Sequence, residues 1–257
     1  MNKSLSDMHV FIAGGLGEIG MQTSLELIQN EAKVTILHSS DKNLGNLKFL
    51  KNDNINLIKV NYLNYENLYD VFLKNAQKGK VNSLISAVGT GKANGIYPYT
   101  NEEVRKLWDL NFFANRNLAI AITEFLLKKK EYNLDYKSSH ILTSSIASQI
   151  NVSAPIDYVT SKAALESLVK SLSYQVSPFQ RINSVSPGHI YTKHGVWGRN
   201  SIKKPKFVKN MINDKIPLNR LGTTDDIAQL FLFLLSGKSS YITGTNIICD
   251  GGLKAKT

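Results

Sequence analysis

The sequence predicts one α/β domain, a doubly wound fold with about seven parallel strands flanked by helices. Apolar runs rich in β-branched residues recur along the 257 residues at roughly regular intervals. Longer stretches with helical spacing separate these runs, which is the pattern of repeated βαβ units. No linker, internal repeat or low-complexity tract divides the chain. We therefore expect residues 1–257 to form a single domain with one extended core.

Seven apolar runs predict the strands, at residues 10–13, 33–37, 56–60, 83–87, 139–143, 181–185 and 246–249. Helical spacing predicts the helices between them, at residues 19–30, 44–51, 65–78, 102–130, 158–176 and 225–235. The segment 189–216 breaks this pattern because it is rich in Lys, Gly and Asn. We predict that this segment is an insertion at the carboxyl edge of the sheet, where ligands of open α/β folds bind.

Composition limits the class of protein. A hydrophobic fraction of 42% and a charged fraction of 20% are ordinary for a globular protein. The formal net charge of +11 would suit an anionic partner, but the lysines scatter along the chain without a basic block interleaved with aromatics. We therefore expect a solvated, lysine-rich surface and no nucleic-acid partner, and we predict no metal site.

The cysteine content and the apolar runs indicate a cellular location. Cys249 is the single cysteine, so the chain cannot form an intramolecular disulfide, and a reducing compartment suits it. Residues 1–8 are polar and the later apolar runs are short, so we expect neither a secretory signal nor a membrane span. The sequence thus predicts a cytoplasmic protein.

A glycine-rich turn follows the first predicted strand. Residues 13–20 read Ala-Gly-Gly-Leu-Gly-Glu-Ile-Gly and lead into a predicted helix. Glycines permit a tight turn and close approach of the backbone, while the helix amides and the helix dipole favour a pyrophosphate. The placement predicts a dinucleotide site that includes Gly14, Gly17, Ile19 and Gly20.

Here the chain resembles the short-chain dehydrogenase/reductase family, which has a Rossmann-type fold and a turn that reads Thr-Gly-x-x-x-Gly-x-Gly. Aligned with this turn, the chain has Glu18 in place of the middle glycine, and Gly17 stands one position early. Either Glu18 points outward or the affinity for the cofactor is compromised. We expect the first, because Gly14 and Gly20 keep the turn and the entry to the helix.

The end of the second predicted strand bears on the choice between the two nicotinamide dinucleotides. A carboxylate at this position holds the ribose hydroxyls, whereas basic and hydroxyl groups hold the 2′-phosphate. Residues 38–42 read His-Ser-Ser-Asp-Lys, so no acid directly ends the strand. Ser39, Ser40 and Lys42 offer donors, and we expect NADP(H) in preference to NAD(H). A plain turn with Asp41 as a helix cap is the alternative interpretation.

The resemblance implies further contacts with the cofactor. Asn61 and Tyr62 follow the third predicted strand, where the family has an acid and a hydrophobic residue beside the adenine. Residues 86–89 read Ser-Ala-Val-Gly where the family has Asn-Asn-Ala-Gly, which retains Gly89. The segment 183–192 resembles the one that cradles the nicotinamide carboxamide, and it supplies Pro187, Gly188, the Ile190 backbone and the Thr192 hydroxyl.

Tyr158 and Lys162 are four residues apart on a predicted helix, so their side chains project from one face. The spacing alone is common, but Ser145 follows one predicted strand and a Pro-Gly turn follows another. Reduction of a carbonyl needs a proton donor at the oxygen. In the reverse direction a tyrosine, whose ordinary pKa is about 10, needs a cation to ionise. Lys162 can supply that charge.

The resemblance gives each of these residues a role. It implies that Tyr158 exchanges the proton, that Lys162 also holds the nicotinamide ribose and that Ser145 orients the substrate oxygen, with Ser144 as an alternative. Asn111 lies inside the predicted helix at 102–130, where an Asn is a poor helix former. The resemblance implies that Asn111 holds a water of the proton relay.

The resemblance extends from Val10 to Leu253, with further matches at residues 220–222, 225–228, 242–244 and 250–252 in the family's order. It implies a homotetramer, built in part from the helix at 102–130 and the C-terminal strand. We expect the segment 189–216 to form a lid over a small-molecule or carrier-protein-linked substrate. The segment contains many basic residues and one acid, Asp214, and this excess of positive charge favours an anionic substrate. A solvated mobile loop is an equally good interpretation.

The leading hypothesis is an NADPH-dependent carbonyl reductase, acting on an acyl chain of a carrier protein, as 3-oxoacyl carrier-protein reductases do, or on an activated or acidic sugar. One alternative is an NAD-dependent alcohol or sugar dehydrogenase. The other is a non-catalytic nucleotide-binding or scaffold member of the fold, which Glu18 and the altered residues 86–89 would suit.

Overall fold

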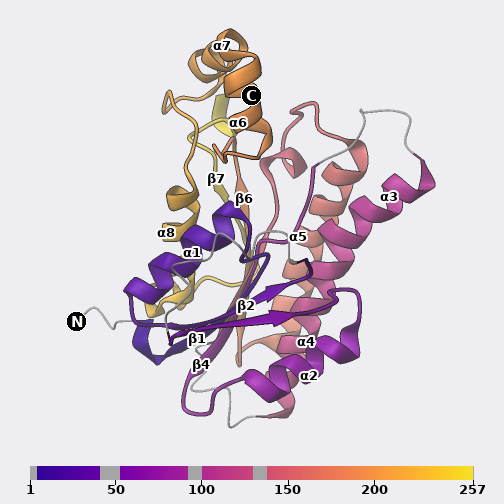
Figure 1. Cartoon of the computed structure of the whole chain (residues 1–257), viewed down its shortest axis with the longest axis vertical. Helices are drawn as coiled ribbons and strands as arrows, with labels where there is room; N and C mark the ends of the chain where they lie inside the picture. Colours follow the sequence, from indigo (N-terminus) through magenta and orange to yellow (C-terminus); the bar gives the residue numbers. More distant parts are fainter. Residues whose placement is uncertain (1–4, 41–52, 92–99, 130–137, 257) are drawn as a thin grey trace.

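A seven-stranded parallel sheet forms the centre of the molecule in the computed structural model, which describes residues 5–40, 53–91, 100–129 and 138–256 (Figure 1). The strand order is β3-β2-β1-β4-β5-β6-β7, and every neighbouring pair is parallel. The predicted doubly wound fold is therefore confirmed. The strands are β1 (Met8–Ala13), β2 (Lys33–His38), β3 (Ile55–Lys59), β4 (Val81–Ser86), β5 (Ser139–Thr143), β6 (Arg181–Pro187) and β7 (Asn246–Cys249).

Helices cover both faces of the sheet (Figure 1). One face carries α1 (Glu18–Gln29) and α8 (Thr224–Leu235), and the other carries α2 (Tyr65–Asn75), α4 (Ala114–Lys128) and α5 (Ile156–Val176). The helix α3 (Asn101–Trp108) leads toward α4, while α6 (Val196–Lys203) and α7 (Pro205–Lys215) follow β6. Short 3₁₀ turns are found at Leu5–Asp7, Ile146–Ser148, Gly237–Ser239 and Lys254–Lys256.

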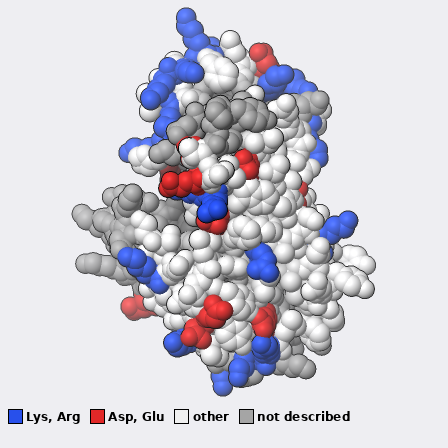
Figure 2. Space-filling model, turned by 90° about the vertical axis from the view of Figure 1, so that its right-hand side faces the viewer, with Lys and Arg blue, Asp and Glu red and all other residues white. Residues whose placement is uncertain are grey.

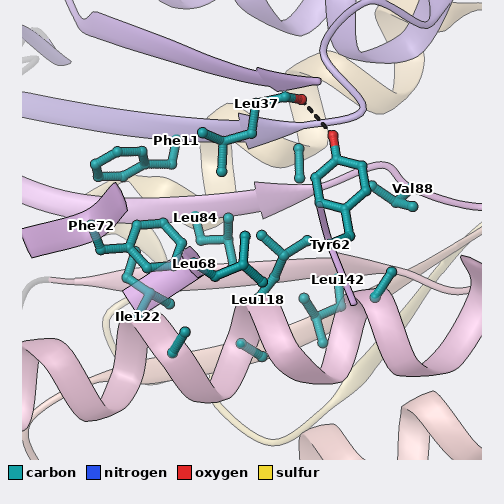
Figure 3. Close-up of a cluster of buried hydrophobic side chains, with 14 of the residues drawn as sticks. Phe11, Leu37, Tyr62, Leu68, Phe72, Leu84, Val88, Leu118, Ile122 and Leu142 are labelled. Carbon is teal, nitrogen blue, oxygen red and sulfur yellow. Dashed lines mark hydrogen bonds between the residues drawn. The ribbon is translucent and has the colours of Figure 1, made fainter. Parts of the chain in front are cut away.

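The core consists of two apolar layers, one on each face of the sheet. Phe11 of β1 points into the layer under α2 and α4, where its ring packs edge-to-face on Phe72 at 4.9 Å (Figure 3). Val10 and Ile12 point into the opposite layer, under α1 and α8, because side chains alternate along a strand. Full burial of such a side chain contributes about 1.5–3 kcal/mol. Apolar strands between two helical layers therefore hold the sheet together.

Side-chain caps set the starts of several helices. Asn64 accepts a hydrogen bond from the amide of Asn67 at the start of α2. Thr100 and Glu103 form a capping box at the start of α3, and Thr223 forms a similar box at the start of α8. Each cap satisfies amides that the first helical turn leaves without partners.

The predicted helix at 102–130 is interrupted. The π-helical turn Asp109–Phe113 separates α3 from α4, and Asn111 lies within that turn. A π turn inserts one extra residue into a helix and is often found at functional sites. Two other helices differ from prediction by a few residues: α2 ends at Asn75 and α5 already begins at Ile156. The predicted helix at 44–51 lies outside the described residues.

The segment 189–216 is more regular than its composition suggested. It contains α6 and α7, and Pro205 occupies the first turn of α7, where its missing amide costs nothing. Val208 is buried, and Met211 and Ile212 pack on a small cluster around Ile216. Because many lysines surround these apolar positions, the narrow stripe gives only a weak periodic signal in the sequence.

Candidate active site

A cavity of about 550 Å³ lies where β5 and β6 end and α5 begins. Parallel strands deliver their carboxyl ends to one edge of a sheet, so segments far apart in the sequence meet there. The predicted site residues that line the cavity are Ile19, Ser145, Tyr158, Pro187, Gly188, Ile190 and Thr192. The cavity therefore joins two of the predicted catalytic residues, Ser145 and Tyr158, to part of the predicted cofactor site, whereas Asn111 and Lys162 do not line it.

Ser145 and Tyr158 line the same cavity, and their hydroxyl groups are close enough to interact. Ser145 follows β5 and caps the 3₁₀ turn Ile146–Ser148, where its hydroxyl oxygen accepts a hydrogen bond from the Ala147 amide at 3.2 Å. Tyr158 lies in the first turn of α5. Burial raises the pKa of Tyr158, while the neighbouring Ser145 hydroxyl acts in the opposite direction. The phenol therefore keeps its proton at neutral pH.

Lys162 is almost completely buried, one turn beyond Tyr158 on α5, with 3% of its surface exposed. Its ammonium group donates a hydrogen bond to the Thr143 carbonyl oxygen at 2.7 Å. Burial lowers the pKa of Lys162 to about 7, because a charged ammonium loses its hydration. A polar or anionic ligand at this ammonium would favour its charged form.

Asn111 and Lys162 meet at Gly89. A Cβ atom at Gly89 would lie 2.7 Å from Asn111 Oδ1 and 3.0 Å from Lys162 Nζ. The side chain of Asn111 binds the backbone of Thr90 in both directions, with N–O distances of 2.9 Å, and it also donates to the Leu107 carbonyl. The structure thus places Asn111 beside Lys162, with its amide anchored to the chain after β4.

The segment after β4 is held by a residue that the sequence analysis missed. Ser86 donates a hydrogen bond to Asn115 Oδ1 at 2.7 Å, and the Asn115 amide donates to the Val88 carbonyl. Asn115 lies one helical turn after Asn111, and that spacing was the available signal. The hydroxyl of Ser86 therefore binds a side chain of α4 at the end of β4, although residues 86–89 lack the asparagines of the family.

The glycine-rich turn keeps the backbone close to the helix that follows it. Gly14 has a φ of +73°, which favours glycine, and a Cβ atom at Gly20 would lie 2.6 Å from the Gly14 carbonyl oxygen. The turn therefore brings the first amides of α1 to the edge of the sheet, where they suit an anion. Thr143 Oγ1 is buried nearby on the cavity wall and has no hydrogen-bond partner among the described residues. This cradle and this donor fit a dinucleotide.

Tyr62 differs from its predicted position beside an adenine. Its side chain is 5% exposed, lies in the core and donates a hydrogen bond to the Leu37 carbonyl at 2.5 Å (Figure 3). The same hydroxyl accepts from the Gly14 amide at 3.1 Å, and burial raises the pKa of Tyr62 to about 12. Tyr62 therefore supports the glycine-rich turn from inside, because its ring fills the apolar layer below. Asn61 is exposed, and its side chain accepts from the Leu63 amide.

Ser39 and Ser40 are exposed directly after β2. Both hydroxyls therefore remain within reach of a ligand at this edge. Asp41 and Lys42, which also bear on cofactor preference, lie outside the described residues. In the described part of this turn, residues 38–40 contain no acid.

Glu18 links the glycine-rich turn to the segment after Thr192. Its carboxylate accepts hydrogen bonds from the backbone amides of Lys193 at 2.6 Å and His194 at 2.9 Å. The expectation that Glu18 points outward is therefore wrong, because two amides 175 and 176 residues away draw the carboxylate across the turn.

Glu166 connects several segments around the candidate catalytic residues. Its carboxylate accepts hydrogen bonds from the hydroxyls of Ser144 at 2.7 Å, Ser186 at 3.1 Å and Ser148, and from the Gln149 amide. Glu166 follows Lys162 by one turn on α5, which is the spacing that would have revealed it.

Apolar residues form most of the remaining cavity wall. They include Ile146, Val152, Ala154, Pro155, Val196 and Trp197. The ring of His189 stacks on Trp197 with 4.0 Å between centroids, and burial lowers the pKa of His189 to about 4, so this wall is uncharged at neutral pH. Among the described residues, no lysine lines the cavity. The lysines of α6 and α7 are exposed instead, at the end of the molecule where Figure 2 shows several basic side chains.

Two further candidate features are absent from residues 5–40, 53–91, 100–129 and 138–256. In these ranges no cluster of three or more His, Cys, Asp or Glu side chains is placed to hold a metal ion. None of the helices there has the length and the apolar character needed to cross a membrane.

The parallel sheet, the glycine-rich turn and the Ser-Tyr-Lys group define a nucleotide-dependent α/β oxidoreductase. A family model described as enoyl-(acyl carrier protein) reductase matches residues 15–254. Short-chain dehydrogenase/reductase SDRA of Arabidopsis thaliana is 32% identical over 185 residues, which cover 71% of this chain and 68% of that protein. The chain belongs to the short-chain dehydrogenase/reductase family, and it is therefore an NAD(P)-dependent oxidoreductase.

Two other similar proteins span nearly the whole chain. Tropinone reductase-like 3 of Erythroxylum coca is 29% identical over 245 residues, 93% of this chain and 90% of that protein. A crystal structure of a short-chain oxidoreductase from Burkholderia thailandensis matches with a TM-score of 0.84 at 22% identity, covering 97% of this chain and 93% of that one. The likeness to the Burkholderia thailandensis structure shows that the two chains share a fold.

Proposed function

We propose that the protein reduces a carbonyl group to an alcohol with NADPH. The observation that carries this proposal is that Ser145 and Tyr158 line one cavity beside the glycine-rich turn, with Lys162 buried behind its wall and bound to the Thr143 carbonyl. When bound, the reduced nicotinamide supplies the hydride. The residues that would hold the dinucleotide are those of the turn at 14–20, Ile190, Thr192 and Lys162.

Tyr158 gives a proton to the substrate oxygen as the carbonyl carbon is reduced. Its raised pKa keeps the phenol protonated at neutral pH, which is the form that reduction requires. Ser145 lies near Tyr158 and lines the same cavity, so its hydroxyl orients the substrate oxygen beside the phenol. Lys162 supplies a buried positive charge that stabilises the tyrosinate left behind. Asn111 positions the water that returns the proton.

The preference for NADPH rests on the turn after β2. The exposed hydroxyls of Ser39 and Ser40 are suitable donors to a 2′-phosphate, and residues 38–40 carry no acid to bind ribose hydroxyls instead.

The substrate has an apolar body around its carbonyl. The apolar wall and the uncharged His189 favour such a substrate at the reacting end. The lysines of segment 189–216 lie outside the cavity, so an anionic handle, such as a carrier-protein arm or a nucleotide, would meet them only where it leaves the cavity. This segment acts as the lid. The similarity to tropinone reductase-like 3 and to enoyl-(acyl carrier protein) reductase is compatible with either kind of substrate.

The protein acts as a cytoplasmic homotetramer. Phe113 and Leu127, beside and within α4, are exposed hydrophobic residues, and β7 is an edge strand whose outer side is open to a second copy in the described sheet. Both features suit contacts between subunits through this helix and this strand. Light scattering coupled to size-exclusion chromatography measures the assembly.

Nucleotide titration and a substrate screen test the enzymatic proposal. We expect NADPH to bind more tightly than NADH in a fluorescence titration, and a panel of apolar ketones to oxidise NADPH. Tyr158→Phe should bind NADPH with a Kd within about threefold of the wild-type value, while its kcat falls by about 10²–10⁴-fold, because the general acid is lost. Unchanged turnover in this variant would refute the mechanism.

A further inference from the structure

The Glu18 bridge, defined by the two hydrogen bonds from the Lys193 and His194 amides to the Glu18 carboxylate, spans the cofactor end of the cavity. Glu18 is the first residue of α1, and its neighbour Ile19 lines the cavity. Thr192, next to Lys193, lines the same cavity from the other side. The bridge therefore joins the two segments between which a dinucleotide would bind.

Two adjacent backbone amides are a suitable site for a phosphate, and here a carboxylate occupies them. The start of α1 presents further amides and the positive end of a helix dipole, which favour any anion placed there. A carboxylate satisfies these groups with one negative charge. A pyrophosphate brings two charges to the same region, so the carboxylate and the pyrophosphate repel one another.

We infer that Glu18 lowers the affinity of this protein for its dinucleotide, because the cofactor must displace the Glu18 bridge to bind. The inference rests on the proposed function. Glu18 is thus a determinant of cofactor affinity that acts through its charge and through the two amides that it occupies. The bridge also holds the beginning of segment 189–216 against the glycine-rich turn until the cofactor arrives.

Nucleotide titration of Glu18→Gln and Glu18→Ala tests the inference. Both variants should bind NADPH more tightly than the wild type, by about 5- to 50-fold, which lies within the usual range for coupled sites. The ratio between the wild type and Glu18→Gln should shrink in 0.5 M salt, because salt screens exposed charges. Glu102→Gln, which removes an exposed carboxylate from the first turn of α3, is the matched control and should leave the Kd unchanged.

Limited proteolysis without nucleotide provides a second measurement. Trypsin cleaves after lysine, and the bridge holds the amide of the peptide bond after Lys193, which belongs to His194, together with the amide of Lys193 itself. Glu18→Ala should therefore be cut after Lys193 several-fold faster than the wild type. Cleavage after Lys238, in the exposed turn Gly237–Ser239, serves as the internal reference and should not change.

The outcomes separate the inference from the proposed function. If the wild type binds NADPH and the Glu18 variants bind it no more tightly, the inference is wrong and the proposed function stands. Equal cleavage after Lys193 in wild type and variant would also contradict the inference, because it would show that the Glu18 bridge does not hold this segment. If neither the wild type nor any variant binds NADPH or NADH, the proposed function is wrong as well.

Discussion

Glu166 offers the sharpest test of how the candidate site is held together. Its carboxylate accepts four hydrogen bonds, three from serine hydroxyls and one from the Gln149 amide. A hydrogen bond to a charged group contributes about 1.5–3 kcal/mol. The three hydroxyls have second acceptors, which are the Lys162 and Ser145 carbonyls and the Asn246 side chain. Removal of the carboxylate therefore leaves one donor, the Gln149 amide, without this acceptor, while the three hydroxyls keep their second acceptors.

This count sets the size of the expected effect. We expect Glu166→Ala to lower the free energy of unfolding by about 2–4 kcal/mol, well below the sum of four charged hydrogen bonds. Ser144 and Ser148 stand on either side of Ser145, so the loss also releases the serine from its place beside Tyr158. We expect kcat to fall by about 10- to 100-fold, equivalent to about 1.4–2.7 kcal/mol. The KM for NADPH should stay the same, since Glu166 has no contact with the glycine-rich turn among the described residues.

Urea unfolding and steady-state kinetics measure the two effects. Glu124→Ala is the control, because Glu124 makes an exposed ion pair with Lys128 on α4, and its loss should cost at most about 0.5 kcal/mol. Glu166→Gln keeps the shape of the side chain but brings an amide against donors, so it should lose kcat with a smaller loss of stability. Our reasoning fails if Glu166→Ala unfolds like Glu124→Ala, or if only the KM for NADPH changes.

Two further predictions concern buried polar groups. Burial lowers the pKa of Lys162 from 10.5 to about 7, so the unfolded chain holds a proton that the folded chain releases, and stability rises with pH between these values. Once the loss of the hydrogen bond to Thr143 is subtracted, Lys162→Met should therefore be more stable than the wild type at pH 7 by about 1–3 kcal/mol. This difference, measured by thermal or urea unfolding, should shrink toward pH 10. A less stable variant at pH 7 would contradict this. Asn115→Ala removes the acceptor of Ser86 and a donor to Val88, and should cost about 2–3 kcal/mol in urea unfolding; a cost near zero would show that the segment after β4 is held otherwise.

Local patterns in the sequence were sufficient to predict the sheet, whereas the four candidate catalytic residues were predicted from their spacing together with the family resemblance. Most strands are short apolar runs packed between the two helical layers, and the strands buried almost throughout are β1, β2, β4, β5 and β6. Tyr158 and Lys162 share a helix face because of their spacing, and Ser145 follows a strand that must end at the same edge. Asn111 was noticed as a poor helix former, and the π turn around it explains the observation.

The secondary structure of the segment 189–216 escaped prediction for a physical reason. The helices α6 and α7 bury few side chains, so their apolar positions are sparse among lysines and asparagines. A helix that rests on the domain with one narrow stripe gives a weak periodic signal. Contact with Ile216 and its neighbours, which depends on the completed fold, provides the burial that this stripe needs.

The α/β class, the positions of the strands, the glycine-rich turn and the family of the chain follow from the order of its amino acids alone. The groups that the polar side chains bind follow only from the folded chain. Glu18 binds amides beyond residue 190, Tyr62 supports the turn from the core, and Glu166 joins three segments. The reason is that periodic burial depends on near neighbours along the chain, whereas a carboxylate or a phenol takes its hydrogen-bond partners from whichever distant segments the fold brings within about 3 Å.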